Sequence, residues 1–256
     1  MDFVGEAAIW QRNAAESPEG VVRRQKVFEA LAMTKGQAVL DIGCGGGQLL
    51  REIALCVGEK GQAVGIDISE EQLGAARSYC EGLTSVELVQ SNATTLPFDD
   101  GIFDGLSSIQ VLEYIQDLNS VLEECRRVLK HGGKVAFISV MWDHWRFHGA
   151  DPKLNDRIME AFRAHCPYQS LPVDLPMRLI KAGFGGINQS PIAFFTGSLH
   201  ENTLAFWASK LAAAFVISQG IDKVDAELWL DQLAQASMEG NFGFVYVPIL
   251  TQATAI

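Results

Sequence analysis

Basic residues are scarce in this sequence. Its 256 residues hold 20 lysines and arginines against 31 aspartates and glutamates, which gives a formal net charge of −11. A protein that binds a phosphate backbone needs a basic patch from which counterions are released. The only basic clusters are the segments VVRRQK and ECRRVLK, and we interpret each as the solvent-facing side of a helix. We therefore expect no nucleic-acid partner.

A cysteine framework, a leader and a long apolar run are missing as well. The five cysteines form no CxxC pair, and no basic region followed by an apolar stretch opens the chain. Both observations favour reduced thiols in the cytoplasm. The most apolar window, LAFWASKLAAAFVIS, contains Lys210 and is too short to span a bilayer. We expect a cytoplasmic protein without membrane insertion, and the sequence indicates no oligomeric state.

What the chain does contain is a regular alternation of short apolar runs and amphipathic stretches, with 48% hydrophobic residues. This pattern predicts strands at 37–43, 61–67, 85–90, 103–109 and 134–140. It predicts helices at 47–57, 69–82 and 118–133, with Ser69 as an N-cap and His131 at a glycine-closed helix end. Continuous apolar strands between helices indicate a doubly wound α/β fold, with a parallel sheet covered on both faces.

The second part of the chain is more helical. Helices are predicted at 151–166, 171–184, 201–218 and 223–240, and strands at 187–195 and 242–255. Neither an internal repeat nor a low-complexity linker interrupts the sequence. We therefore expect a single domain over 1–256, in which a core at 20–140 carries added helical cap segments at 142–170 and 197–240.

The segment VLDIGCGGG (39–47) places glycines 43, 45 and 47 in the turn between the first strand and its helix. Glycine permits positive φ and close backbone approach, so such a turn can point N–H groups toward a ligand at the strand's carboxyl end. It is either a plain tight turn or a nucleotide-cofactor loop. The second strand ends in Asp67, where a carboxylate can accept hydrogen bonds from both ribose hydroxyls, and this favours the cofactor loop.

A dinucleotide is the less favoured occupant of that loop. A GxGxxG fingerprint would require its third glycine at position 48, which is Gln48. Asp41, two residues before the first glycine, would also set a negative charge near a pyrophosphate. That charge suits a cationic cofactor better than NAD.

At these residues the chain resembles the class I S-adenosylmethionine-dependent methyltransferases, in the branch of quinone-biosynthesis and natural-product enzymes. VLDIGCGGG is similar to the family's first motif, and GIDIS (65–69) to its acidic second-strand end. Residues 91–115 resemble the third and fourth strand region, and RVLKHGGKVAFIS resembles the helix, turn and fifth strand. The resemblance implies a Rossmann-like methyltransferase fold with a seven-stranded, mostly parallel sheet, and S-adenosylmethionine as the cofactor.

The resemblance also implies which residues contact the methionyl part of the cofactor. The backbone of Gly43 and Cys44, together with Gly45, would approach the methionyl moiety. Asp41 would orient the ammonium group from behind. Ile109 would line the methionyl end of the site.

Four further residues would contact the adenosine part. Asp67 would bind the ribose hydroxyls and Ile68 would pack on the adenine face, while Asn92 and Ala93 would read the adenine edge. The family usually has aspartate where this chain has Asn92. An amide oxygen can still accept from the adenine amino group without charge assistance, so we expect cofactor binding to survive.

The aromatic stretch MWDHWRFHGA (141–150) follows the fifth strand, where ligands of open α/β sheets bind. Its aromatic residues could simply pack a cap, or His144 and His148 could bind a metal from one helical face, although no third ligand is evident. Its position favours a third interpretation, an acceptor pocket beside the transferable methyl group. His144 or His148 is then the candidate general base. Tyr114 is a second catalytic candidate beside Glu113, although a solvated helix start is slightly favoured for that pair.

The expected function is methyl transfer by in-line displacement to a small or medium organic acceptor. The cap is rich in Trp, Phe, Leu and Met, which favours an acceptor with an apolar body, and the acceptor atom can be oxygen, nitrogen or carbon. Three alternatives stay open. They are a relative that uses the bound sulfonium for a non-methylating reaction, a nicotinamide-dependent oxidoreductase and a non-catalytic binding protein.

Overall fold

The computed structural model describes residues 4–256, and these form two compact units. Unit 1 comprises the chain up to Val22 together with Val140–Ser170 and Ile192–Pro248. Unit 2 comprises Arg23–Ser139, Leu171–Pro191 and Ile249–Ile256. Across residues 4–256, no helix is long and apolar enough to cross a bilayer.

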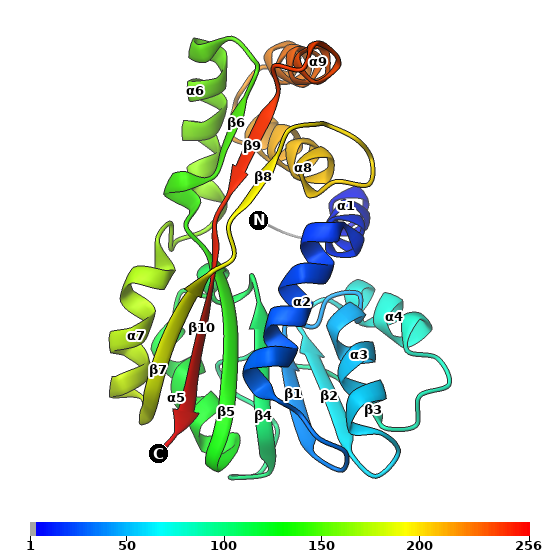
Figure 1. The fold of residues 1–256 in the computed structure, drawn as a ribbon, viewed down its shortest axis with the longest axis vertical. Helices are drawn as coiled ribbons and strands as arrows, with labels where there is room; N and C mark the ends of the chain where they lie inside the picture. The colour runs from blue at the N-terminus through cyan, green and yellow to red at the C-terminus, as the bar shows by residue number, and fades with distance from the viewer. Residues whose placement is uncertain (1–3) are drawn as a thin grey trace. The chain divides into compact units, whose positions relative to one another are not determined.

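Unit 2 is built on a seven-stranded sheet (Figure 1). In sheet order its strands are β3 (Val86–Gln90), β2 (Gln62–Asp67), β1 (Ala38–Ile42), β4 (Phe103–Ile109), β5 (Leu129–Val140), β10 (Pro248–Ala255) and β7 (Phe184–Pro191). The pairs β1–β2, β2–β3, β1–β4 and β4–β5 are parallel, and β10–β7 is antiparallel. The predicted doubly wound, mostly parallel sheet is confirmed.

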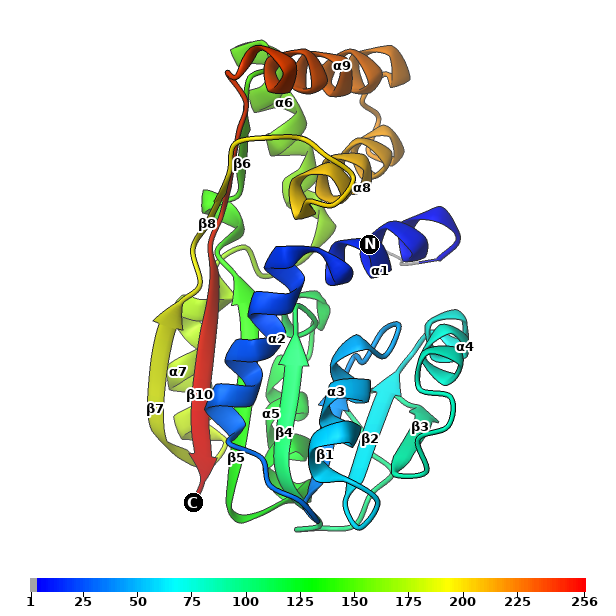
Figure 2. The ribbon, with the colours of Figure 1, turned by 45° about the vertical axis from the view of Figure 1, so that its right-hand side comes forward.

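Helices cover both faces of this sheet, as Figures 1 and 2 show. One face carries α3 (Gln48–Val57), α4 (Glu70–Tyr79) and the part of α2 (Pro18–Leu31) that belongs to unit 2; the other carries α5 (Leu118–Val128) and α7 (Leu171–Lys181). The predicted N-cap is confirmed, because Ser69 Oγ accepts a hydrogen bond from the Gln72 N–H at 3.3 Å. The central strands lie between two helical layers, which is why their sequences are apolar without alternation.

Several predicted element boundaries were wrong. The predicted strand 187–195 is divided between β7 and β8 (Phe194–Thr196), which belong to different sheets. Helix α5 ends at Val128 and β5 begins at Leu129, so His131 is an exposed strand residue and no helix end lies beside it. Leu129 pairs with Phe103, and a register shift in the β4–β5 pairing accommodates the extra residues before Lys134. The apolar run 242–255 forms two strands, β9 (Gly243–Tyr246) and β10, which belong to different sheets.

The interpretation of VVRRQK as a solvent-facing helix side was also wrong. Arg23 and Arg24 in α2 are only 4% and 6% exposed. Arg24 Nε donates to Glu52 Oε1 at 2.7 Å, and Arg23 Nη1 donates to the side-chain oxygen of Gln110. A buried guanidinium is tolerated where its N–H groups find acceptors, and sequence alone does not reveal such acceptors.

Within residues 4–256, unit 1 combines a small sheet with four complete α-helices and the first residues of α2. They are β6 (Arg146–His148), β9 and β8 (Phe194–Thr196), paired antiparallel in that order, and α1 (Glu6–Glu16), α6 (Pro152–Phe162), α8 (Leu204–Ser218) and α9 (Lys223–Glu239). Aromatic rings fill its core, where Phe147 stacks on Phe244 at 4.4 Å and meets Trp229 edge-on at 5.2 Å between ring centroids. Asn155 joins this core by donating to the Phe147 carbonyl and accepting from Trp229 Nε1, both at 2.9 Å.

Candidate functional site

The glycine loop between β1 and α3 directs its amides into the protein. The N–H groups of Gly43 and Cys44 both donate to the Ile66 carbonyl, at 2.8 and 2.9 Å, and the Gly47 N–H donates to the Cys44 carbonyl at 3.0 Å. Gly45 donates to Asp67, as described next. The expectation that this turn points its N–H groups toward a ligand was therefore wrong for these four amides. They tie the loop to the carboxyl end of β2 instead.

The carboxylate of Asp67 is fixed by backbone donors on both of its oxygens. Oδ2 accepts from the Gly45 N–H at 3.0 Å, and Oδ1 accepts from the Ser69 N–H at 2.9 Å. Each carboxylate oxygen can accept more than one hydrogen bond. The next residue, Ile68, is 73% exposed, which leaves an aliphatic surface open beside this oriented carboxylate.

Asp41 lies at the end of β1 and is only 3% exposed. Burial raises the pKa of its carboxyl group to about 7, against an opposing hydrogen bond that Ser107 Oγ donates at 2.8 Å. The negative charge of Asp67 raises this pKa further. Two carboxylates thus meet at the ends of neighbouring strands, and a cation between or beside them would relieve their repulsion.

The loop after β3 contains the two residues predicted to read adenine. Asn92 is exposed, and its Oδ1 accepts from the Thr94 N–H at 3.0 Å, so this oxygen already has one backbone partner. Ala93 is buried. Their contact with the adenine edge stays a prediction.

The chain at the end of β4 contains a predicted site residue, Ile109, followed by a residue that the sequence did not point to, Gln110. Ile109 pairs with Ile138 and is half-buried, as a residue lining a site at this edge would be. The next residue, Gln110, has a φ of 55°, which is left-handed and rare outside glycine. No sequence signal marks a left-handed glutamine, because asparagine, aspartate and glycine are the usual occupants of this region.

Glu113 and Tyr114 belong to η1 (Leu112–Tyr114), a short 3-10 turn that follows β4. The slight preference for a solvated helix start was wrong for Glu113, whose side chain is fully buried. Tyr114 is half-buried. Its catalytic role stays a prediction.

In the stretch 141–150 the structure separates aromatic from titratable side chains. Trp145 and Phe147 are buried in the core of unit 1, whereas His144 and His148 are exposed. The two histidines lie in η2 (Trp142–His144) and β6, so the shared helical face that a metal site required does not form. Across residues 4–256 no cluster of three or more His, Cys, Asp or Glu side chains could hold a metal ion.

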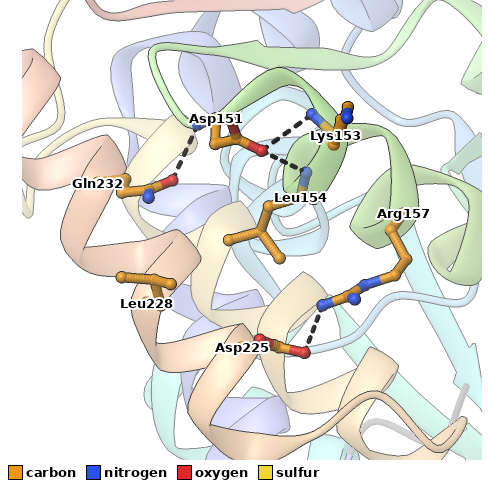
Figure 3. Close-up of a pocket in the computed structure, with 7 residues that line it drawn as sticks. All are labelled: Asp151, Lys153, Leu154, Arg157, Asp225, Leu228 and Gln232. Carbon is orange, nitrogen blue, oxygen red and sulfur yellow. Dashed lines mark hydrogen bonds and ion pairs between the residues drawn. The ribbon is translucent and has the colours of Figure 1, made fainter.

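A hollow of about 410 Å³ on unit 1 contains none of the predicted site residues (Figure 3). It lies between α6 and α9 and is lined by Asp151, Lys153, Leu154, Arg157, Asp225, Leu228 and Gln232. Its polar groups bind one another. The Asp151 N–H donates to Gln232 Oε1 at 2.9 Å, and Arg157 pairs with Asp225. These are the contacts of a helix junction.

Known proteins are similar to the region of this chain that contains the glycine loop. A family described as a methyltransferase domain matches residues 40–137. A demethylmenaquinone methyltransferase of Staphylococcus epidermidis is 37% identical over 114 residues, which are 44% of this chain and 47% of the relative. The chain thus spans about half the length of such curated relatives, and only 34% of one of them.

Solved structures match over a larger part of the chain. A phosphoethanolamine N-methyltransferase of Haemonchus contortus in complex with S-adenosyl-L-methionine gives a TM-score of 0.65 at 20% identity, covering 99% of this chain and 57% of that chain. An S-adenosylmethionine-dependent methyltransferase of Aquifex aeolicus gives 0.54 at 25% identity, covering 70% of this chain and 89% of that chain. The first likeness concerns the fold alone.

Proposed function

Since residues 40–137 belong to the class I S-adenosylmethionine-dependent methyltransferases, we propose that this protein binds S-adenosylmethionine at the carboxyl ends of β1, β2 and β4. It transfers the methyl group by in-line displacement to a small or medium organic acceptor. All the residues assigned to the cofactor lie within unit 2.

The observation that carries this proposal is the pairing of inward-turned amides with two carboxylates. A pyrophosphate is held by backbone N–H groups that point at it. Here the N–H groups of Gly43, Cys44, Gly45 and Gly47 are used within the protein, and Asp41 lies buried behind the loop. A nucleoside that carries a sulfonium and an ammonium group fits this site, whereas NAD does not.

The adenosine part is assigned to the end of β2 and the loop after β3. Asp67 accepts hydrogen bonds from the ribose hydroxyls, because its carboxylate is oriented by two backbone donors and retains acceptor capacity. The exposed side chain of Ile68 covers one face of the adenine. Asn92 and Ala93 lie at the adenine edge.

The methionyl part is assigned to the ends of β1 and β4. Asp41 stabilises the ammonium group electrostatically, while the Gly43 and Cys44 backbone and Ile109 surround the methionyl chain. Burial raises the pKa of the Cys44 thiol, so Cys44 remains protonated and does not compete as a nucleophile.

When bound, S-adenosylmethionine supplies an activated methyl group on a sulfonium sulfur. The chain then has to orient the acceptor and keep water away from it, and these two effects supply most of the rate. A hydroxyl acceptor must also lose a proton. The candidate bases for this proton are Tyr114, His144 and His148.

The acceptor is proposed from the chemistry of unit 1 and from the relatives. The segments 142–170 and 197–240 contain aromatic side chains that are only partly buried, among them Trp142 and Trp207, and such side chains suit an acceptor with an apolar body. A relative that matches this chain over 114 residues is named a demethylmenaquinone methyltransferase, which makes quinone precursors the first acceptors to examine. We place the protein in the cytoplasm, since no disulfide joins any two of its five cysteines in the structure.

Calorimetric titration with S-adenosylmethionine, S-adenosylhomocysteine and NADH tests the cofactor. We expect both sulfur nucleotides to bind and NADH not to bind. Asp67→Ala should abolish binding, whereas Asp99→Asn, a change at an exposed loop carboxylate, should not affect it. Binding of NADH alone, or unchanged affinity in Asp67→Ala, would contradict the proposal.

The transfer step is tested by incubating the protein with S-adenosylmethionine and phenols, amines or quinone precursors. Methylated acceptor and S-adenosylhomocysteine should appear in equal amounts. Acceptor conversion with S-adenosylmethionine left intact would instead support the non-methylating alternative.

A further inference from the structure

Gln110 has a left-handed backbone conformation that its position after a strand does not explain. Residues 4–256 contain two non-glycine residues with positive φ, Ala32 at 48° and Gln110 at 55°. Ala32 follows the last turn of α2, and its N–H donates to the Phe28 carbonyl at 2.9 Å. Left-handed residues are common at such helix ends. Gln110 follows a strand, so its conformation needs another cause.

Two contacts hold Gln110 in this conformation. Its N–H donates to the Ile138 carbonyl of β5 at 2.8 Å, which extends the β4–β5 pairing past Ile109. Its side-chain Oε1 accepts from Arg23 Nη1 of α2. Strained backbone of this kind persists only where the surrounding structure fixes it, and it is concentrated at functional sites.

The residue after Gln110 contacts the cofactor loop. A Cβ built on Gly43 would lie 2.3 Å from Val111 Cγ2 and 2.8 Å from Val111 Cγ1. The side chain of Val111 therefore lies directly against the Gly43 backbone. The direction in which the chain leaves Gln110 decides whether Val111 reaches this position.

We propose that Arg23 and Gln110 form a positioning pair, in which the buried arginine holds Gln110 left-handed and thereby keeps Val111 against Gly43. Helix α2 is thus linked to the cofactor loop through three residues. The consequence for cofactor affinity rests on the proposed function, whereas the consequence for the ligand-free loop does not.

The link predicts a non-additive double-mutant cycle. Gln110→Ala, Arg23→Met and the double variant each break the same connection, so each should raise the Kd for S-adenosylhomocysteine by about tenfold. Hydrogen exchange at residues 43–47 of the ligand-free protein should accelerate to a similar extent in all three. A double variant whose loss is the product of the two single losses would overturn the pairing.

A second comparison isolates the backbone conformation. Gln110→Gly loses the bond to Arg23 but adopts positive φ without strain, so its Kd should lie between those of the wild type and Gln110→Ala. Equal Kd values for the two variants would overturn the role of the conformation. This test does not depend on whether Arg23→Met folds.

Ala32→Gly is the matched control, since it relieves the other left-handed residue, which follows the end of α2. It should leave both the Kd and the exchange of residues 43–47 unchanged. If the wild type binds neither sulfur nucleotide, the proposed function fails, while loop exchange still tests the positioning pair. Unchanged loop exchange in Gln110→Ala would overturn it.

Discussion

At the scale of single residues, the ionisation of Asp41 links stability to the proposed chemistry. Burial raises its pKa to about 7, so near neutral pH the carboxyl group is only partly ionised. Its ionised form is destabilised by lost hydration and by Asp67, and is favoured by the hydrogen bond from Ser107. A group in this balance responds both to pH and to a cation placed beside it.

Asp41→Asn should be more stable than the wild type, and this difference in the free energy of unfolding should grow as pH rises. Burial raises the pKa of the folded carboxyl group to about 7 from its ordinary value of 3.8, so between these pH values the folded state holds a proton that the unfolded state has lost. The wild-type free energy of unfolding therefore falls from about pH 4 to about pH 7, by at most about 4 kcal/mol from this group. Asparagine keeps an acceptor for Ser107 and removes the titration.

Urea unfolding of both proteins at about pH 5 and about pH 8 measures this difference. The stability gain of Asp41→Asn should be several-fold larger at the higher pH. Asp99→Asn serves as the control at an exposed carboxylate and should show no such trend. A gain for Asp41→Asn that is equal at both pH values would contradict an elevated pKa in the folded state.

Cofactor binding should release protons from Asp41. An ammonium group near the carboxylate lowers its pKa, so at about pH 6.5 binding of S-adenosylhomocysteine expels up to one proton. Titration in two buffers of different ionisation enthalpy should give different apparent binding enthalpies. Asp41→Asn should abolish that difference, and a wild-type enthalpy that is independent of the buffer would exclude the proposed contact.

At the scale of elements, the β1–α3 connection depends on a contact with the chain that follows β4. Gly43 has a φ of 68°, and its missing side chain leaves room for Val111 of the chain after β4. Two separate requirements, positive φ and close approach, therefore meet at one position. They can be distinguished by comparison with a glycine that meets only the first.

Gly43→Ala should destabilise the protein more than Gly36→Ala. Gly36 also has positive φ, at 87°, but nothing lies within 4 Å of a Cβ built there. Its substitution should cost about 1 kcal/mol from backbone strain, whereas the clash at Gly43 adds about 1–3 kcal/mol more. Urea unfolding of the two variants gives the comparison, and equal costs would mean that Val111 moves aside freely.

The sequence predicted the elements of unit 2 well because their signals are local. The five predicted apolar strands correspond to β1 to β5, and Ser69 is the N-cap of α4 as predicted. The boundary at Val128 was missed because a register shift with β4 decides it, and Arg23 was misplaced because its acceptor, Gln110, lies 87 residues away. Asp41 and Asp67 were proposed as site residues from the motifs that contain them. Gln110 was not, since its conformation comes from tertiary contacts.

At the scale of the whole molecule, the sequence predicted a single domain with cap segments, and the structure groups those segments in a second compact unit. The small sheet of unit 1 was not foreseen, because β6 and β8 have three residues each and carry little periodicity. Its aromatic residues are the Trp145 and Phe147 that looked like pocket walls. Pairing with β9, distant in sequence, makes them core residues.

Phe147→Ala should therefore weaken unit 1 specifically. The side chain is fully buried among Trp145, Trp229 and Phe244, so its removal should cost about 3–5 kcal/mol. Hydrogen exchange should accelerate in β6, β9 and α9, while β1 to β4 keep their protection, because unit 2 has a core of its own. Phe195→Ala, at a 72% exposed phenylalanine of β8, is the matched control and should change stability by less than about 0.5 kcal/mol. Equal acceleration in β1 to β4 would mean that the two units unfold as one cooperative block.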